Sequence, residues 1–535
     1  MVAARRHRRA RRAVLAVVAS TLLAACSFSP PVPRTSEEPP PSAPSTAPAP
    51  TATPSLPAKG RPLSAVPDVR PQGFTDPPPG SGLDRYDNQR LSWTRCTQEL
   101  VCASVLAPLD YAEPDGTAIT LALAKRPARA EPKLGTLFVN PGGPGGPGRN
   151  YAASFNTGGL EGYDVVGWDP RGVAGSTPVR CFGTADYDRF FSVDVSPDSA
   201  AEERRLVAET YAFDQSCLAH SGALLEHVST ATTVRDLELL RRLVGDPELH
   251  YFGASYGTQI GSLYAQLYPK HVGRMVLDGA VNIGGRSLSQ IEGFERALGH
   301  FATWAAEPGP RGQPLGTSRA AVLDKIQALL VGLDANPLQV PGGRAVSQQQ
   351  GVGGVLNSLY ERADWTPLLQ ALTTASQGDG RALLKLADEG NFRNPDGSYG
   401  QINDAFPAVR CLDSRASSVR AAERSAEREA KKAPILGPLS GPDLICPLWP
   451  VAPASKAPRI TAKGAAPILV LGTTGDPATP YENAEGMARQ LESGVLVTLE
   501  GEGHTAYGQS ACVRSKVQAY LVNGTVPEDG TRCPS

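Results

Sequence analysis

The stretch LHYFGASYGTQ, residues 249–259, decides the fold of this chain. Its apolar first half predicts a short buried strand over 249–254, and a helical pattern over 256–268 follows until Pro269. The link between them has the form Gly-x-Ser-x-Gly, with Ser255 at its centre. The glycines are needed because this turn is tight, and the turn leaves its serine exposed at the C-terminal edge of a sheet. We therefore predict that Ser255 is a nucleophile.

Strand and helix patterns alternate on both sides of this turn. Strands are expected at 117–125, 134–140, 163–169, 274–277, 467–472 and 494–500, and helices at 232–244 and 509–521. This alternation predicts an α/β fold with a mostly parallel central sheet flanked by helices. Helical patterns at 291–306, 318–334, 366–375 and 414–432 dominate the middle of the chain. They predict a helical cap that is inserted between two halves of the sheet domain.

Charge and hydropathy exclude several classes of protein. The 535 residues contain 52 basic and 53 acidic side chains, so a generally basic nucleic-acid-binding surface is excluded. No apolar run reaches the roughly 18 residues of a membrane-spanning helix, which excludes a polytopic membrane protein. No Cys-x-x-Cys and no His pair at metal-binding spacing occurs. We expect no metal, no cofactor and no nucleic-acid partner, and we expect a monomer.

The N-terminus has the pattern of an export signal. Six arginines within residues 1–12 precede an apolar stretch at 13–25 and then Cys26. The sequence LAAC at 23–26 resembles the lipobox of bacterial lipoproteins, which implies cleavage before Cys26 and attachment of lipid to its sulfur. The alternative is a plain secretory signal in which Cys26 has no role. The choice between general secretory and twin-arginine export stays open.

A proline-rich segment follows the signal. Residues 27–80 hold 17 of the 49 prolines and almost no aliphatic side chains, so they cannot bury enough surface to fold. We expect a semi-extended tether. The predicted organisation is a signal peptide at 1–25, a tether at 26–85, the first part of the core at 86–281, the cap at 282–444 and the last part of the core at 445–535.

Eight cysteines remain after Cys26, and an even number in an exported chain indicates disulfides. Eight thiols allow 105 pairings, and the sequence does not choose between them. Pairing of sequence neighbours is our expectation. It joins Cys96 with Cys102, Cys181 with Cys217, Cys411 with Cys446, and Cys512 with Cys533.

A serine nucleophile needs a base and an acid that orients the base, and in this fold they follow the serine along the chain. Only His271, His300 and His504 follow Ser255. We expect His504 to be the base, because it lies in the flexible loop EGEGHT, residues 500–505, after an apolar strand. The acid should end a late strand. Asp476 fits this place in TTGDP, residues 473–477, and Asp278 is the rival.

The negative oxygen that forms during acyl transfer needs backbone N–H donors. One donor should be Tyr256, the residue after the nucleophile. The second should come from NPGGPGGPG, residues 140–148, where glycine lets the backbone approach the substrate. We favour Gly143, with Gly142 as the alternative. A phosphate-binding loop is the alternative, but the Gly-Lys-Ser/Thr sequence that such a loop needs is absent.

Several spaced motifs together carry a family resemblance. They are residues 140–148, WDPRG at 168–172, GASYGT at 253–258, LDG at 277–279, CPLWP at 446–450, GDPATP at 475–480 and GH at 503–504. This set resembles the α/β-hydrolase family of actinobacterial tripeptidyl aminopeptidases and its relatives, the prolyl aminopeptidases. The match covers roughly 90–280 and 440–535, and the late segment is similar to the TAP-like C-terminal domain of that family.

The resemblance implies an aminopeptidase that releases short peptides from free N-termini through Ser255, Asp476 and His504. The family's cap usually offers carboxylates to the substrate's α-ammonium group. Glu292 and Glu295 are possible equivalents, although charged exposed helix faces are far commoner. Family members often carry a Trp-Cys pair in this helix. Here Ala305 follows Trp304, so the cap departs from the family.

Three hypotheses follow from the sequence. The first is an exported aminopeptidase, anchored by lipid to the outer face of the cell membrane or shed from it. The second is a carboxylesterase or lipase with the same catalytic residues, because the triad does not distinguish peptides from small esters. The third is a non-catalytic envelope protein on a hydrolase scaffold, which an intact Ser, Asp and His set disfavours.

Overall fold

The computed structural model describes residues 73–283, 288–414, 418–454 and 459–535. The predicted signal peptide, Cys26 and most of the predicted tether lie outside these residues. Those predictions therefore stay predictions.

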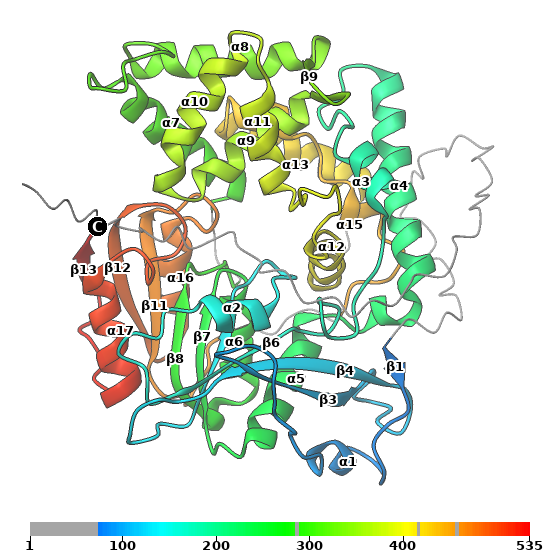
Figure 1. Ribbon diagram of the computed structural model, residues 1–535, viewed down its shortest axis with the longest axis vertical. Helices are drawn as coiled ribbons and strands as arrows, with labels where there is room; N and C mark the ends of the chain where they lie inside the picture. The colour runs from blue at the N-terminus through cyan, green and yellow to red at the C-terminus, as the bar shows by residue number, and fades with distance from the viewer. Residues whose placement is uncertain (1–72, 284–287, 415–417, 455–458) are drawn as a thin grey trace, which may run out of the picture. The chain divides into compact units, whose positions relative to one another are not determined.

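An 11-stranded sheet runs through the described chain (Figure 1). Its order is β2-β3-β4-β6-β5-β7-β8-β11-β12-β13, and β1 pairs with β4. The strands from β6 to β13 in this order pair in parallel, while β1, β2, β3 and β4 are antiparallel. The strands are β1 (Phe74–Thr75), β2 (Thr94–Arg95), β3 (Val101–Pro108), β4 (Ala118–Arg126), β5 (Thr136–Asn140), β6 (Asp164–Trp168), β7 (Leu249–Ala254), β8 (Val272–Asp278), β11 (Ile468–Gly475), β12 (Gly494–Glu502) and β13 (Thr531–Pro534).

Helices cover both faces of this sheet. Helices α2 (Gly148–Ser154) and α17 (Ala511–Asn523) bury apolar side chains against one face. Helices α5 (Thr230–Val244), α6 (Gly257–Leu267) and α16 (Tyr481–Gln490) do so against the other. The central parallel strands read as continuous apolar runs because they are buried on both faces. The predicted α/β fold, with a mostly parallel sheet between helices, is confirmed.

The inserted segment has a hydrophobic core of its own. This core includes Phe301, Leu330, Val355 and Leu372. Its elements are α7 (Gln290–Ala306), α8 (Arg319–Ala335), β9 (Leu338–Val340), β10 (Arg344–Val346), α9 (Gln348–Leu359), the 3-10 turn η3 (Arg362–Asp364), α10 (Trp365–Ala375), α11 (Arg381–Gly390), α13 (Val419–Lys432) and α14 (Leu436–Ser440).

One helix of the inserted segment packs on the sheet domain and not on the core of the insertion. Helix α12 (Ile402–Asp413) buries Ala408, Val409 and Leu412 in the hydrophobic core of the sheet domain. The sequence placed this stretch in the cap with its neighbours. The structure shows that the inserted segment returns to the sheet domain at α12 and then leaves it again.

A second insertion separates β6 from α5. It contains α3 (Thr184–Phe190), the long helix α4 (Ala200–Ser221) and the 3-10 turn η1 (Gly222–Glu226). Helix α4 packs Leu206 and Val207 against Leu444 and against Leu448 of α15 (Ile445–Leu448). Our sequence analysis did not predict this second insertion. The remaining short elements are α1 (Asp84–Asp87) and the 3-10 turn η2 (Pro269–His271).

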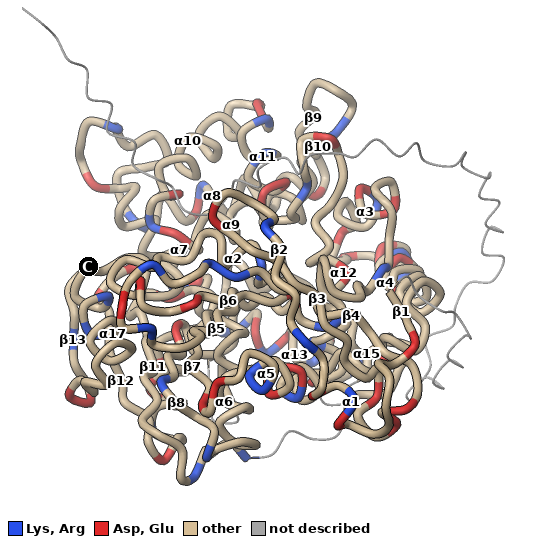
Figure 2. Tube along the Cα trace, turned by 60° about the horizontal axis from the view of Figure 1, so that its bottom comes forward, with Lys and Arg blue, Asp and Glu red and all other residues tan. Residues whose placement is uncertain are grey.

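Four disulfides join the cysteines of the described chain. The pairs are Cys96–Cys102, Cys181–Cys217, Cys411–Cys446 and Cys512–Cys533, as neighbour pairing predicted. Charged side chains of both signs are interspersed along the trace (Figure 2). Of the helices that the structure describes, none combines the length and the apolar character needed to span a bilayer.

Candidate active site

Ser255 occupies the turn between β7 and α6, in a left-handed backbone conformation with φ of 53°. Its amide donates a 2.8 Å hydrogen bond to the carbonyl oxygen of Asp278, at the end of the neighbouring strand β8. The flanking glycines are needed because of close contacts. A Cβ at Gly253 would lie 2.4 Å from the Gly257 carbonyl oxygen, and one at Gly257 would lie 2.9 Å from the Asn140 carbonyl oxygen. The Gly-x-Ser-x-Gly pattern thus produces the strained turn that exposes a serine.

His504 and Asp476 form a close pair. His504 Nδ1 lies 2.9 Å from Asp476 Oδ2 and 3.0 Å from Oδ1. The Asp476 side chain is completely buried. Because a carboxylate only accepts hydrogen bonds, the proton of the neutral imidazole resides on Nδ1 and Nε2 is left as the base.

The electrostatics of the pair favour a charged imidazole. Burial alone lowers the pKa of His504, but the negative charge of Asp476 and its hydrogen bond act in the opposite direction. The charges of Asp278 and Glu361 add to this attraction. The net result is a pKa raised above the ordinary value of 6.5. A raised pKa suits a base that must hold a proton while the leaving group departs.

The end of β8 brings Ser255 and His504 to the same place. Asp278 binds the Ser255 amide, and the next residue, Gly279, lies against the imidazole. A Cβ at Gly279 would be 3.0 Å from His504 Cε1. His504 Nε2 is buried and has no hydrogen-bond partner in the described part of the chain. Hydrogen bonds between a nucleophile and its base often tighten only when substrate binds.

Asp278, the rival acid, has a different task. Its carboxylate accepts hydrogen bonds from the amides of Ala506 (2.8 Å) and Tyr507 (2.9 Å), which follow His504 in the chain. Burial raises the pKa of Asp278 to about 6. Asp278 therefore fixes the backbone of the histidine loop, while Asp476 contacts the imidazole itself.

The other two histidines that follow the serine have partners elsewhere. His271 Nδ1 is 3.1 Å from Glu238, and His300 Nδ1 is 3.0 Å from Glu502. Neither contact involves Ser255 or Asp476. Of the three candidates, only His504 contacts Asp476, and Gly279 at the end of β8 places its ring beside the Ser255 turn.

The glycine-rich loop after β5 packs directly on the serine turn. A Cβ at Gly142 would lie 2.8 Å from the Tyr256 amide nitrogen and 2.9 Å from Ser255 Cβ. The Gly142 amide already donates to Asn140 Oδ1 at 2.9 Å. Within the described residues, the amides of Gly143 and Tyr256 donate no hydrogen bond. Both amides therefore remain available to a substrate oxygen.

Two residues of the site were missed by our sequence analysis. Thr479 Oγ1 donates to Asp476 Oδ2 at 2.9 Å and lies 3.3 Å from His504 Nδ1. The carbonyl oxygen of Tyr360 accepts the His504 amide at 2.7 Å, and the two rings meet edge to face. Thr479 had a signal, since it lies three residues after Asp476 in a quoted motif. Tyr360 had none, because it comes from a distant segment.

The cap glutamates chosen from the sequence both have internal partners. Glu292 accepts the Ser289 amide at 2.8 Å in a helix-capping box, and Lys432 Nζ lies 3.3 Å from it. Glu295 accepts the amides of Ile435 (3.1 Å) and Leu436 (2.9 Å). No cluster of metal-binding side chains is found in the described part of the chain.

The fold and the site together define a serine-type hydrolase, with the serine turn, the imidazole–carboxylate pair and the glycine loop all at the C-terminal ends of parallel strands. Two family models match the chain: "alpha/beta hydrolase fold" over residues 135–305 and "TAP-like protein" over residues 434–533. The chain belongs to the α/β-hydrolase family.

Curated relatives extend this match over most of the chain. Serine protease Hip1 of Mycobacterium tuberculosis is 35% identical over 482 residues, which cover 83% of this chain and 91% of that protein. Carboxylesterase B of the same species is 35% identical over 473 residues, 83% and 89% of the two chains. Tripeptidyl aminopeptidase of Streptomyces lividans is 30% identical over 478 residues, 83% and 86%. A solved proline iminopeptidase of Mycobacterium smegmatis has 15% identity and a TM-score of 0.36, covering 78% of this chain and 98% of that one.

Proposed function

We propose that the protein is an aminopeptidase that cleaves short peptides from free N-termini through an acyl-enzyme. Ser255 Oγ bonds to the scissile carbonyl carbon while His504 Nε2 takes the hydroxyl proton. The carbonyl electrons move to the oxygen, which the amides of Gly143 and Tyr256 bind. The C–N bond then breaks, and His504 gives its proton to the leaving amine. A water molecule then attacks the carbonyl carbon of the acyl-enzyme while His504 takes the water proton. His504 returns the proton to Ser255 Oγ as the ester bond breaks, and the free acid is released.

Glu361 is the observation that favours peptides over esters. Within the described residues, its carboxyl has neither a hydrogen bond nor a salt bridge. Burial, the largest cause, raises the pKa of Glu361 to about 7, although the charge of His504 acts to lower it. A largely desolvated carboxylate without a cation is costly. The α-ammonium group of a substrate would supply that cation, and an ester has no such group.

The backbone at Glu361 is held from both sides. Tyr360, the residue before it, accepts the His504 amide through its carbonyl oxygen. The guanidinium of Arg362, the residue after it, lies 4.7 Å from the ring of Trp304 and 4.2 Å from that of Trp365. Glu361 therefore has a defined position next to the histidine loop. Glu292 and Glu295 remain candidates for the amine site, but their carboxylates have internal partners.

A carboxylesterase is the second candidate, because a relative of that name is as similar as the named serine protease. Turnover of a free tripeptide anilide, its N-acetylated form and a short acyl ester distinguishes the two. An aminopeptidase should cleave the free peptide and lose activity when the amine is blocked. Equal rates for free and blocked peptides, or turnover of esters alone, would refute the aminopeptidase. A fluorophosphonate probe should label the protein but not Ser255→Ala, with Ser262→Ala as the control.

Glu361→Gln tests the amine site. It should raise KM for the free peptide by about 10- to 100-fold, since one ionic hydrogen bond is lost, and leave ester turnover unchanged. In the wild type, KM should rise as the pH falls below about 7, because Glu361 then becomes neutral. Glu292→Gln and Glu295→Gln are matched controls. If either of them, and not Glu361→Gln, raises KM for the free peptide alone, the amine site lies there instead.

We also propose that Cys26 is lipidated and that the monomeric enzyme is tethered to the outer face of the membrane. The four disulfides fit an extracytoplasmic location. Metabolic labelling with a fatty acid and membrane fractionation should show an anchored wild type and a released Cys26→Ala variant. An unlabelled wild type would identify a plain secretory signal. Size-exclusion chromatography with light scattering checks the expected monomer.

A further inference from the structure

Helix α12 covers the glycine-rich loop of the candidate active site. A Cβ at Gly145 would lie 3.0 Å from Ala405 Cβ and 3.2 Å from Ile402 Cγ1. A Cβ at Gly143 would lie 3.5 Å from Ile402 Cδ1. The first turns of α12 therefore pack on the loop that carries one of the two expected oxyanion donors.

The last residue of α12 is connected to the other donor. Asp413 Oδ1 accepts the Thr230 amide at 2.9 Å, and Oδ2 accepts the Thr230 hydroxyl. Thr230 Oγ1 also lies 2.5 Å from the phenol oxygen of Tyr256. The carboxyl further accepts the side-chain amide of Gln259 at 3.4 Å. Asp413, Thr230 and Tyr256 thus form one hydrogen-bonded chain.

The direction of these hydrogen bonds follows from the number of protons that each side chain can donate. A carboxylate offers only acceptors, so the single hydroxyl proton of Thr230 goes to Asp413. Thr230 Oγ1 must then accept the phenol proton of Tyr256. The Tyr256 side chain is buried and has this one polar partner among the described residues. Its ring position, and with it the peptide unit after Ser255, is therefore fixed by residues outside the triad.

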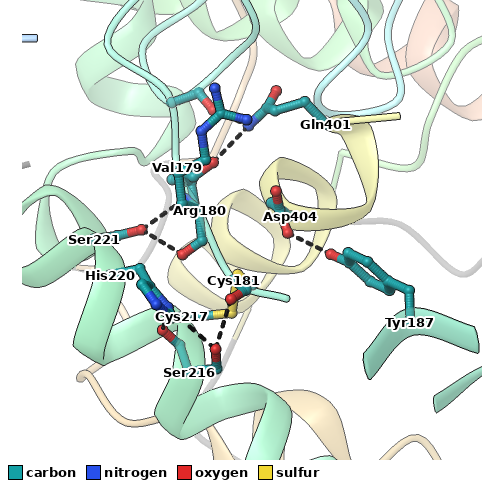
Figure 3. Close-up of a disulfide and its surroundings, with 11 residues drawn as sticks. Val179, Arg180, Cys181, Tyr187, Ser216, Cys217, His220, Ser221, Gln401 and Asp404 are labelled. Carbon is teal, nitrogen blue, oxygen red and sulfur yellow. Dashed lines mark hydrogen bonds between the residues drawn. A yellow bond between two sulfur atoms is a disulfide. The ribbon is translucent and has the colours of Figure 1, made fainter. Parts of the chain in front are cut away.

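Helix α12 is itself anchored at points away from the active site. The Gln401 side chain, just before the helix, donates to the carbonyl oxygens of Gly172 (2.8 Å) and Val179 (2.9 Å). Asp404 accepts the hydroxyl of Tyr187, and Figure 3 shows both side chains beside the Cys181–Cys217 disulfide. The Cys411–Cys446 disulfide holds the last turn.

We propose that α12 positions both oxyanion donors, by packing on the Gly143 loop and by holding Tyr256 through Asp413 and Thr230. The inference rests on the proposed oxyanion role of Gly143 and Tyr256, but it holds for peptides and esters alike. Donors to an oxyanion act only within about 2.7–3.1 Å of it, so a small displacement of the Tyr256 amide weakens the transition state more than the substrate complex. Asp413 and Thr230 are positioning residues in this scheme.

The test compares Thr230→Val, which removes the hydroxyl at nearly constant shape, with Thr230→Ser, which keeps it. Activity is measured on a p-nitrophenyl acyl ester, so the test does not depend on the aminopeptidase proposal. Thr230→Val should lower kcat by about ten-fold with KM changed less than two-fold. It should raise the inhibition constant of a boronic acid, whose tetrahedral adduct occupies the oxyanion site, by the same factor. Thr230→Ser should restore both values.

Tyr520→Phe is the control for a general loss of stability, because it removes a buried phenol hydroxyl that bonds the Pro467 carbonyl oxygen and the Met275 amide, away from α12. It should lower Tm and leave kcat and boronate inhibition unchanged. If Thr230→Val is as active as the wild type, or changes KM and boronate inhibition equally without affecting kcat, the proposal is wrong. The same holds if Tyr520→Phe reproduces the loss of kcat. If Thr230→Val fails to fold, Tyr256→Phe can replace it in the test, because it removes the phenol hydroxyl from the same hydrogen-bonded chain.

Discussion

The backbone amide of His504 donates a 2.7 Å hydrogen bond to the carbonyl oxygen of Tyr360. The two residues come from different parts of the chain: His504 follows β12 of the sheet, and Tyr360 follows helix α9 of the inserted segment. The insertion thus supports the loop that carries the base. Its role extends beyond the choice of substrate, because the position of the imidazole depends on it.

Replacement of the two aspartates should separate their tasks. Asp476→Asn should lower kcat by about 10⁴-fold, because an amide no longer holds the imidazole in the correct tautomer. Asp278→Asn should mainly lower stability, since asparagine keeps an acceptor oxygen for only one of the amides of Ala506 and Tyr507 and turns an N–H donor toward the other. Steady-state kinetics and thermal unfolding measure both effects. Collapse of kcat in Asp278→Asn with only a few-fold loss in Asp476→Asn would reassign the acid.

The pH profile should follow the protonation of His504. The base must be neutral to accept the serine proton, and its pKa is raised above 6.5, so kcat/KM should fall as the pH drops through that raised value. Loss of the negative charge at position 476 removes the main cause that raises the pKa of His504. The acid limb of Asp476→Asn should therefore move to lower pH, when residual activity is followed with an activated ester. An unmoved limb would assign it to another group.

Thr479 should orient the acid and the base together. Its hydroxyl donates to Asp476 Oδ2 and lies near His504 Nδ1. Thr479→Val should lower kcat by about ten-fold, the effect of one hydrogen bond to a charged group, with little change in KM. Thr479→Ser keeps the hydroxyl and should retain most of the activity. Full activity in Thr479→Val with a loss in Thr479→Ser would show that the methyl group, not the hydroxyl, matters.

The buried ion pair of Arg171 and Asp236 should dominate local stability. Both side chains are fully buried, and Arg171 Nη2 lies 2.6 Å from Asp236 Oδ1. Asp236→Ala leaves an uncompensated buried guanidinium and should lower the free energy of unfolding by about 3–5 kcal/mol in urea titrations. Asp379→Ala breaks the exposed pair with Arg381 and should change the free energy of unfolding far less, because solvent screens such a pair. Equal small losses would contradict this prediction.

The sequence predicted those parts of the molecule that depend on local patterns. The strand, turn and helix around Ser255 follow from apolar runs and from glycines that close contacts require. His504 and Asp476 could be chosen because both follow late strands, whose C-terminal ends meet at one edge of a parallel sheet. The neighbour pairing of cysteines was also correct.

What the sequence missed depends on contacts between distant segments. Nothing in the local pattern of Tyr360 or Glu361 indicates that they lie beside the histidine loop. Helix α12 has the same amphipathic character as the cap helices, so the pattern does not show that it packs on the sheet domain. The partner of Asp413 is Thr230, and no periodicity relates the two.

The arrangement of the disulfides has a mechanical consequence. Each bridge joins cysteines 6 to 36 positions apart, two bridges precede Ser255, and two lie after it. No covalent crosslink in the described chain therefore connects the half that holds the nucleophile to the half that holds Asp476 and His504. A single proteolytic cut in the inserted segment before Cys411 would leave two fragments that only the sheet and packing keep together. Denaturation would then separate them even without a reducing agent.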